Sequence, residues 1–442
     1  MAFALVTAVS SQAASTVAAV TTTTDSATPH LLAHQAPLAL NSGDTAWMIV
    51  ATALVLFMTL PGLALFYGGM VRKKNLLATL AQSVAVTVIA TVLWVAVGYT
   101  LSFGVGPSDG WNAVLGGFDS VMLHGVNNNT AYSAAKGLPE YLWVAYQMTF
   151  AIITPALIAG SIAERMKFSA FVLFIALWSV LVYAPVCHWV WGGGWLGKLG
   201  VLDFAGGSVV HVNSGVAGLV AALVLGKRKG FGRDNMAPHN LGYTMIGASM
   251  LLVGWIGFNA GSEWAADSIA SVAMLNTIVA TMTGAIGWIV PEWIERKRPT
   301  LLGMVSGMVV GLVAITPAAG FVNPGGALAI GLIAGPICYI ASTYVKNMFK
   351  YDDSLDAFGV HGVGGFTGAV LTAVFADKDI NSLGAGASVL KQLTGLAAVI
   401  AWSAVVTFAI LMVCKYTTGL RVSEEEEIEG LDMSQHGETL HG

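Results

Sequence analysis

The chain has 442 residues, of which 56% are hydrophobic and only 10% are charged, and its formal net charge is −4 at pH 7. Soluble globular domains carry about 25% charged residues, so this composition excludes a large soluble domain and indicates a membrane protein. The small net charge gives no indication of nucleic-acid binding. The cysteines lack the spacing of a disulfide framework or a metal site; they are Cys187, Cys338 and Cys414.

The first 45 residues are rich in Ala, Thr and Ser. The apolar run Phe3–Val9 is compatible with a secretory signal followed by a short exposed linker, but no Lys or Arg precedes it, as a signal would require. A misassigned start codon or a disordered leader explains this composition equally well. We therefore divide the chain into a leader at 1–45, a membrane domain at 46–416 and a cytoplasmic tail at 417–442.

Eleven later stretches are apolar enough to cross a bilayer, which takes about 20 helical residues. None of them contains Asp, Glu, Lys or Arg. The sequence therefore predicts an all-α polytopic membrane protein with 11 transmembrane helices, at 46–67, 76–103, 141–163, 168–190, 207–226, 241–260, 269–290, 301–318, 325–344, 357–375 and 393–413.

The basic residues between these stretches predict the orientation. Alternate loops hold 16 of the 20 Lys and Arg residues, whereas the other loops hold only Lys136, Lys198, Lys378 and Lys391. The positive-inside rule places the basic set in the cytoplasm. The N-terminus is then outside and the C-terminus inside, which agrees with an odd number of spans.

Five spans per half would give two halves of opposite orientation, so we predict two inverted five-helix halves plus a final helix. His211 and His361 then fall in the last span of each half. An acidic residue precedes each histidine, Asp203 by eight positions and Asp356 by five. Inverted halves would bring the two imidazoles together at a pseudo-twofold axis.

An ionisable side chain at bilayer depth is costly, and such residues usually face a protein interior or a pore. One such histidine alone would be structural. Four glycines in the segment Phe358–Gly365 surround His361, however, and let helices approach closely, which favours a narrow lumen lined by both histidines. Neutral imidazole offers one donor and one acceptor, which suits a small neutral molecule with N–H groups. No ring of carboxylates or carbonyls indicates a hydrated metal ion.

Aromatic and polar residues lie toward the outer ends of several spans. Phe150 lies mid-span in the third, Trp191 follows the fourth, and Phe258 and Ser262 end the sixth. Each alone would be a packing or interface residue, whereas together they could form a cation–π cup with a hydroxyl acceptor. Asp203 is most simply a helix cap, and its field would also favour a nearby cation.

Seven longer motifs carry a resemblance to a known family. They are LPGLALFYGGMVRKKN at 60–75, GSIAERMKFSAF at 160–171, HWVWGGGW at 188–195, DFAGGSVVHVN at 203–213, GWIGFNAGS at 254–262, DAFGVHGVGG at 356–365 and GLRVSEEEEIEGLDMSQHGE at 419–438. Over residues 44–440 the chain resembles the ammonium transporter (Amt/methylammonium permease/Rhesus) family, and its bacterial members most closely.

The resemblance implies roles for single residues. An external ammonium-recruitment site would comprise Phe150, Trp191, Ser262 and the backbone carbonyl of Ala205, and it would be shaped by Asp203. In the same way Phe150 and Phe258 would form a stacked phenyl gate, while His211 and His361 would be the twin histidines of the pore. Tyr146 stands where many relatives carry phenylalanine, a change expected to alter the polarity of the vestibule.

The resemblance also implies a homotrimer in the inner (plasma) membrane, with one pore per subunit and a PII-type signal protein docking on the cytoplasmic face. By composition alone Glu424–Glu427 would be only a solvated acidic face. We expect no cofactor, no metal ion and no nucleic-acid partner.

The expected mechanism separates ammonium from potassium by chemistry. Ammonium would lose its proton at or below the phenyl gate and cross as ammonia, whereas potassium has no neutral form and meets the full penalty of charge burial. The motifs leave open whether the proton follows through the histidine pair or the protein is a neutral gas channel.

Two other classes of protein remain as alternatives. A haem enzyme would need paired histidines on shared helices, and this chain has one per helix, so we expect no enzyme activity. An ammonium sensor with little flux would normally carry an appended cytoplasmic domain, and only residues 417–442 follow the membrane domain.

Overall fold

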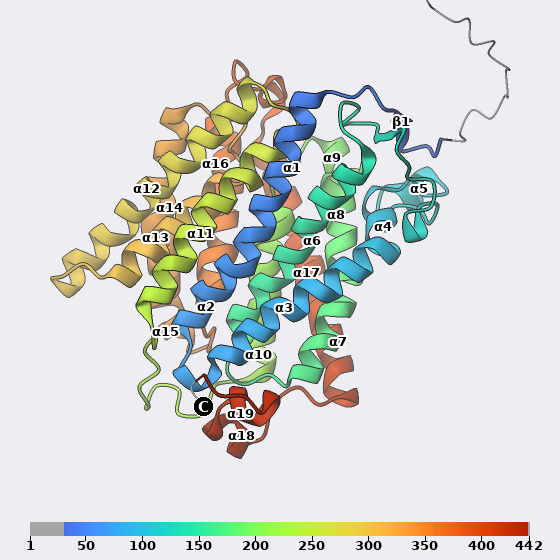
Figure 1. Ribbon diagram of the computed structural model, residues 1–442. Coiled ribbons are helices and arrows are strands. Elements are labelled where there is room, and N and C mark those ends of the chain that lie inside the picture. The colour runs from blue at the N-terminus through green and yellow to red at the C-terminus, as the bar shows by residue number, and fades with distance from the viewer. Residues whose placement is uncertain (1–30, 441–442) are drawn as a thin grey trace, which may run out of the picture. The chain divides into compact units, whose positions relative to one another are not determined.

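The computed structural model describes residues 31–440, so most of the predicted leader lies outside the described part. Helices make up nearly all of this part (Figure 1). Ten described segments are long and apolar enough to cross a membrane, which establishes a multi-pass helical fold: Ser42–Met70, Lys73–Phe103, Glu140–Ile162, Phe168–Leu199, Gly207–Leu225, Leu241–Glu263, Ser268–Arg296, Pro324–Phe349, Phe358–Phe375 and Val389–Thr417.

An eleventh apolar helix, α13 (Leu301–Ile315), has only 15 residues. It falls within the predicted span 301–318, so the eleven expected spans correspond to ten long segments and one short helix. The inverted halves and the sides on which the termini lie stay predictions.

Six of the ten segments contain one α-helix each. They are α6 (Glu140–Ile162), α10 (Asn213–Leu225), α11 (Leu241–Ala260), α12 (Ser268–Arg296), α16 (Val363–Phe375) and α17 (Val389–Thr417).

Four segments consist of several helices joined by breaks. The first break contains Pro61, which cannot donate the backbone hydrogen bond of a regular helix. The helices of these segments are α1 (Ser42–Phe57) and α2 (Ala64–Met70), α3 (Leu76–Leu93) and α4 (Tyr99–Phe103), α7 (Phe168–Trp178), α8 (Ala184–Val190) and α9 (Trp195–Leu199), and α14 (Pro324–Ile340) and α15 (Lys346–Phe349).

Helix α6 lies at the centre of the bundle, where it packs against α1, α3 and α10. Of its apolar window 83% is buried, against 33% for α17. Exposed apolar side chains on α17, such as Val405 and Phe408, are suited to contact lipid. The core therefore surrounds α6, and α17 lies at the periphery.

Close glycine contacts hold α12, α13 and α14 together. A Cβ atom at Gly311 on α13 would lie 2.1 Å from the carbonyl oxygen of Ala280 on α12. A Cβ atom at Gly335 on α14 would lie 2.6 Å from Gly287 on α12. Membrane helices use such small residues to bring their backbones into contact.

A small sheet marks one end of the bundle, which we call the outer end. Strand β1 (Gln35–Pro37) pairs antiparallel with β2 (Thr130–Tyr132), near the short helix α5 (Asp109–Asn112) (Figure 1). The Gln35 amide also donates a hydrogen bond to Glu140 at 2.9 Å. The expected exposed linker is therefore packed against the protein at residues 34–36, because backbone pairing and Glu140 hold it there.

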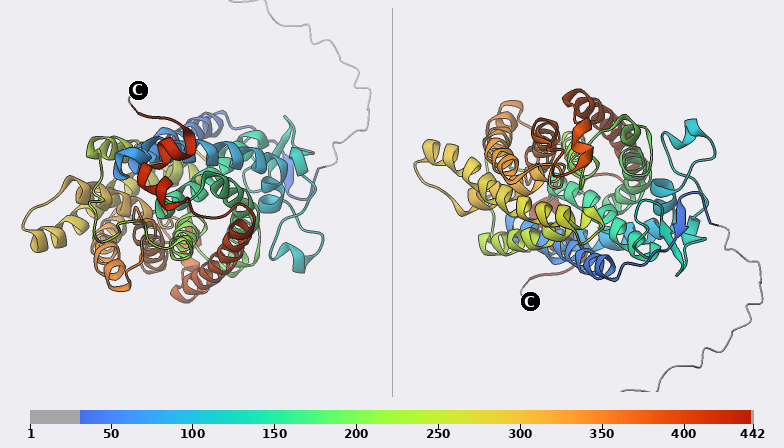
Figure 2. Two further views of the ribbon diagram at one scale, coloured as in Figure 1. Left: turned by 90° about the horizontal axis from the view of Figure 1, so that it is seen from below. Right: turned by 90° about the horizontal axis from the view of Figure 1, so that it is seen from above.

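Two short helices, α18 (Glu424–Glu429) and α19 (Leu431–His436), lie across the opposite, inner end, as Figure 2 shows from below. Asp432 accepts a hydrogen bond from the backbone N–H of Ala78 at 2.8 Å, and the N–H of Leu431 donates to Asn75 at 2.9 Å. The tail is thus folded onto the start of α3.

Candidate functional site

A cavity of about 580 Å³ opens at the outer end of the bundle. Its lining brings together Phe150, Trp191, Asp203 and Ser262, four of the residues that the sequence predicted for recruitment. They come from α6, the end of α8, the loop before residue 207 and the short turn Gly261–Glu263 that follows α11. Ala205 lies in the same loop with a fully buried side chain, and the role of its carbonyl stays a prediction.

Two stacked phenyl rings separate this cavity from the interior. The ring centroids of Phe150 and Phe258 lie 4.3 Å apart with 20° between the planes. Trp191 stands at 90° to Phe150, with 5.7 Å between the centroids. Phe150 lines the outer cavity and Phe258 lines the cavity beyond, so the stack forms the boundary.

The hydroxyl of Ser262 is held in place at the edge of the outer cavity. It donates to the carbonyl oxygen of Phe258 at 2.8 Å, which leaves its lone pairs as acceptors. The Tyr146 hydroxyl lies 2.9 Å from the same carbonyl and 3.3 Å from the Ser262 oxygen. Tyr146 therefore adds a polar group next to Ser262 and the phenyl stack.

Asp203 is a cap whose two oxygens are occupied. Its carboxylate accepts the backbone N–H groups of Gly206, Gly207, Ser208 and Val209 at 2.6–3.1 Å, and also the Ser208 hydroxyl. The backbone carbonyl of Asp203 accepts the indole N–H of Trp191 at 2.9 Å. Asp203 therefore fixes both the start of the His211 segment and the orientation of Trp191.

The two histidines meet, as the sequence predicted. The Nδ1 atoms of His211 and His361 lie 3.3 Å apart, and the rings are nearly parallel at 18°. One Nδ1 must donate and the other accept, because neutral imidazole carries a single N–H. His211 also stacks on Trp255 at 5.3 Å, and His211 Nε2 has no hydrogen-bond partner among the described residues.

A narrow cavity of about 10 Å³ lies between the phenyl stack and the histidines, which is about the space of one water-sized molecule. Its other lining is apolar and includes Leu157, Leu251 and Val309. His361 also lines a third cavity, of about 150 Å³, toward the inner end. The three cavities together trace a path through the bundle, interrupted at the phenyl stack.

Each histidine sits in a π-helical turn at the start of its segment, Gly207–Val212 and Phe358–Gly362. Asp353 accepts the N–H groups of Ala357 and Phe358 at 3.2 and 2.8 Å, as Asp203 does in the first segment.

The counterpart of Asp203 is therefore Asp353, eight positions before His361, rather than Asp356, five positions before it. Asp356 instead pairs with the Lys346 amine at 2.7 Å. The equal spacing of eight residues was the signal in the sequence that would have identified Asp353.

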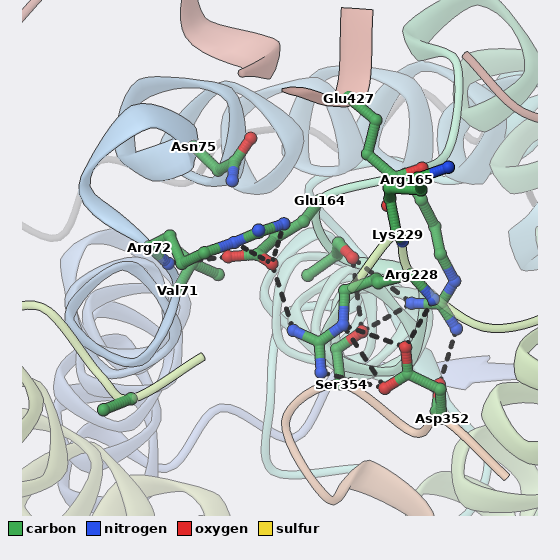
Figure 3. Close-up of polar contacts among 12 residues, drawn as sticks. Val71, Arg72, Asn75, Glu164, Arg165, Arg228, Lys229, Asp352, Ser354 and Glu427 are labelled. Atoms are coloured by element: carbon green, nitrogen blue, oxygen red, sulfur yellow. Dashed lines mark hydrogen bonds and ion pairs between the residues drawn. The ribbon is translucent and has the colours of Figure 1, made fainter. Parts of the chain in front are cut away.

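A buried network of ion pairs, which the sequence did not reveal, lies at the inner end (Figure 3). Glu164 accepts from Arg72 at 2.9 Å and from Arg228 at 3.1 Å. Arg228 also binds Asp352 through two nitrogens, at 2.8 and 3.0 Å. Arg165 donates to the backbone oxygen of Asp352 at 2.5 Å. The network joins four loops that are distant in the sequence.

Burial and pairing shift the pKa values of this network. Burial lowers the pKa of Arg165 to about 10, although nearby Asp352 opposes the shift. Burial alone would raise the pKa of Asp352, but the hydrogen bonds and charge of Arg228 outweigh it and lower that pKa below its ordinary value. The Asp352 carboxylate therefore stays ionised beside Arg228.

The tail joins this end of the protein through Glu427, which is 2% exposed. Glu427 accepts from Arg421 at 2.6 Å and from the backbone N–H of Lys229 at 2.5 Å. The acidic run is therefore not a uniformly solvated face, because one of its members is buried and paired.

The fold and the cavities define a class: a multi-pass helical membrane protein whose bundle encloses a narrow path with a central histidine pair. The model of the Ammonium Transporter Family matches residues 46–441, and the chain belongs to this family.

Relatives and solved structures agree with this membership. The chain is 48% identical to the ammonium transporter of Bacillus subtilis, over 90% of this chain and 98% of that one. It is similar to the crystal structure of Saccharomyces cerevisiae Mep2, with a TM-score of 0.80 and 33% identity over 88% of this chain and 89% of that chain. It is also similar to a structure called Sensor Amt Protein, with a TM-score of 0.81 and 28% identity, covering 89% of this chain and 98% of that chain.

Proposed function

We propose that the protein carries ammonium across the membrane and that the substrate passes the histidine pair as ammonia. The observation that carries this proposal is the line of three cavities, in which an aromatic outer cavity leads through a phenyl stack to a narrow, apolar lumen with two facing imidazoles. The family membership supports ammonium as the substrate. The names of the relatives support a transporter rather than an enzyme.

Recruitment takes place in the outer cavity. The perpendicular rings of Phe150 and Trp191 offer a cation–π environment, which contributes about 2 kcal/mol or more when the cation is desolvated. The free lone pairs of Ser262 accept an N–H of ammonium. Asp203 contributes through its field and by holding Trp191, because its oxygens are already occupied.

Selection follows at the phenyl stack. The lumen holds little more than one water-sized molecule and presents no counter-charge, so a bare cation there meets the full penalty of charge burial. Ammonium gives up its proton at or below the stack, and ammonia continues along His211 and His361, which offer one donor and one acceptor. Potassium cannot follow because it has no neutral form.

The proposal includes the wider setting that the sequence implied. The protein acts as a homotrimer in the inner (plasma) membrane, and a PII-type protein docks on its cytoplasmic face. The folded tail at the inner end supports such docking, since α18 and α19 add a structured surface to the loops.

A complementation test examines the transport proposal. We expect the chain to restore growth of a strain that lacks ammonium uptake, at low ammonium and acidic pH. His211→Ala should lower uptake by about tenfold or let potassium leak, because a buried hydrogen-bonding group is lost. The exposed His124→Ala serves as a control that should behave as wild type. Unchanged flux and selectivity in His211→Ala would remove the histidines from the path.

An ammonium sensor with little flux is the second candidate, and the similarity to the Sensor Amt Protein favours it. The same complementation separates the two functions, since a sensor without useful flux does not restore growth.

We propose further that the proton is transferred through the histidine pair, so that transport is electrogenic. One charge crossing 100 mV gains about 2.3 kcal/mol, which supports accumulation. The Nδ1–Nδ1 distance of 3.3 Å supports this version, because one proton can be shared there. Currents on solid-supported membranes test this proposal, and a transient current should follow the addition of ammonium. Ammonia flux without a current would instead favour a neutral gas channel.

A further inference from the structure

The inner cavity lies on the line of three cavities, but the transport mechanism described so far gives its polar lining no role. We propose that the carboxylate of Glu292 and the hydroxyl of Ser342 bind the ammonium ion there, at the inner mouth of the pore. This inference rests on the proposed function, and it adds a second cation site beyond the histidines.

The first observation is a pair of buried acceptor atoms without partners. Glu292 is 3% exposed and Ser342 is 8% exposed, and both line the inner cavity of about 150 Å³. Neither Glu292 Oε2 nor Ser342 Oγ has a hydrogen-bond partner among the residues that the structure describes. Leaving a buried polar atom unpaired is unfavourable, and it is more so for a charged group. The cavity therefore favours a guest that donates hydrogen bonds.

The second observation is how Glu292 is held. Its Oε1 accepts the Thr300 hydroxyl at 2.8 Å at the start of α13, and Arg296 lies 3.9 Å from the same oxygen. Its Oε2 lies over Gly303, where a Cβ atom would come within 1.9 Å of it. One oxygen thus positions the side chain, while the other has no hydrogen-bond partner in the part of the chain that the structure describes.

The neighbouring charges leave Glu292 as the cation acceptor. Asp356 also lines the cavity, but Lys346 neutralises it at 2.7 Å. Arg296 is 55% exposed in its side chain, so solvent screens its effect on Glu292. The remaining titratable groups of the lining are two tyrosines and the pore histidine: Tyr67, Tyr339 and His361.

The chemistry of the site suits ammonium. A carboxylate and a hydroxyl accept two of its four N–H groups, and the bond to the carboxylate is strengthened by charge. The cavity leaves room for water on the remaining N–H groups. Because His361 lines both the lumen and this cavity, ammonia that passes the histidines enters the place where the cation is stabilised.

Transport measured separately from the two faces tests the site. Right-side-out and inside-out membrane vesicles are supplied with radiolabelled methylammonium as the probe. In Glu292→Gln we expect the half-saturating concentration at the inner face to rise by about tenfold, since a charged hydrogen bond becomes neutral. At the outer face it should stay within about twofold, because the outer cavity is unchanged. An unchanged inner value, or equal shifts at both faces, would overturn the inner site.

Three further variants separate binding from a structural role. Glu425→Gln changes an exposed carboxylate on α18, outside the lining of the inner cavity, and should behave as wild type. Thr300→Ala removes the cap of α13 and the hydroxyl that positions Glu292, so it should lower the melting temperature and shift the inner value less than Glu292→Gln does. An inner shift as large as that of Glu292→Gln would assign Glu292 to the helix start and overturn the proposal.

Ser342→Ala keeps the test decisive if Glu292→Gln does not fold. We expect it to raise the inner half-saturating concentration by about two- to threefold, and no shift would contradict the site. Wild-type vesicles that take up no methylammonium from either face would refute the proposed function itself. Normal wild-type uptake together with unaffected variants would refute only the inner site.

Discussion

The histidine pair and the inner ion-pair network are both buried, but their polar atoms differ in how many hydrogen-bond and ion-pair partners they have. Among the described residues the rings of His211 and His361 hydrogen-bond only to each other, and the buried Nε2 of His211 has no partner. Glu164 and Asp352, in contrast, have arginine partners and additional backbone donors. The comparison teaches that His211, which lines the lumen, keeps a nitrogen without a partner, whereas the paired carboxylates of the network hold the loops in place.

The largest expected effect is a loss of stability when one charge of the inner ion-pair network is removed. Asp352→Asn keeps the shape of the side chain but leaves Arg228, 7% exposed, without its full partner. Breaking a buried ion pair on one side destabilises a protein by about 3–5 kcal/mol. Thermal unfolding of the purified protein should show this loss, and the exposed Asp379→Asn provides the control. A loss equal to that of the control would mean that the network does not support the fold.

A lower pH should also weaken the ion pair of Asp352 and Arg228, with a smaller loss of stability. The folded pKa of Asp352 lies below its unfolded value of about 3.8, so its contribution is complete above that pH and disappears as the pH falls through the folded pKa. The difference in melting temperature between wild type and Asp352→Asn should therefore shrink below about pH 4. A constant difference down to pH 3 would contradict the charge-based explanation.

The smallest expected effect is a change in ammonium affinity when a hydroxyl next to the phenyl stack is removed. Tyr146→Phe removes a hydroxyl that contacts the carbonyls of Gly257 and Phe258 and the Ser262 oxygen. One neutral hydrogen bond contributes about 1 kcal/mol, so the half-saturating ammonium concentration at the outer face should change by less than about fivefold. Tyr141→Phe, which loses one bond to Val126, is the matched control. A loss of all transport would show that Tyr146 belongs to the gate itself.

The sequence predicted the membrane helices and the meeting of the histidines because both depend on hydropathy and position. It missed residues whose partners are distant in the chain. Glu292 was placed in a loop because the expected span ended at 290, whereas α12 continues to Arg296. The rule that a span contains no charge therefore concealed a buried carboxylate. Arg228 and Asp352 looked like ordinary loop charges, since nothing local indicates that the two loops meet.

The early end of α13 has a consequence for the voltage that the substrate experiences. Fifteen helical residues measure about 22 Å, whereas the hydrocarbon core is about 30 Å thick. The helix ends at Ile315, and Phe321 in the following loop lines the outer cavity. We therefore expect a cation on the phenyl stack to have crossed part of the membrane's electric field already, so that the potential across the bilayer acts on its arrival as well as on its passage.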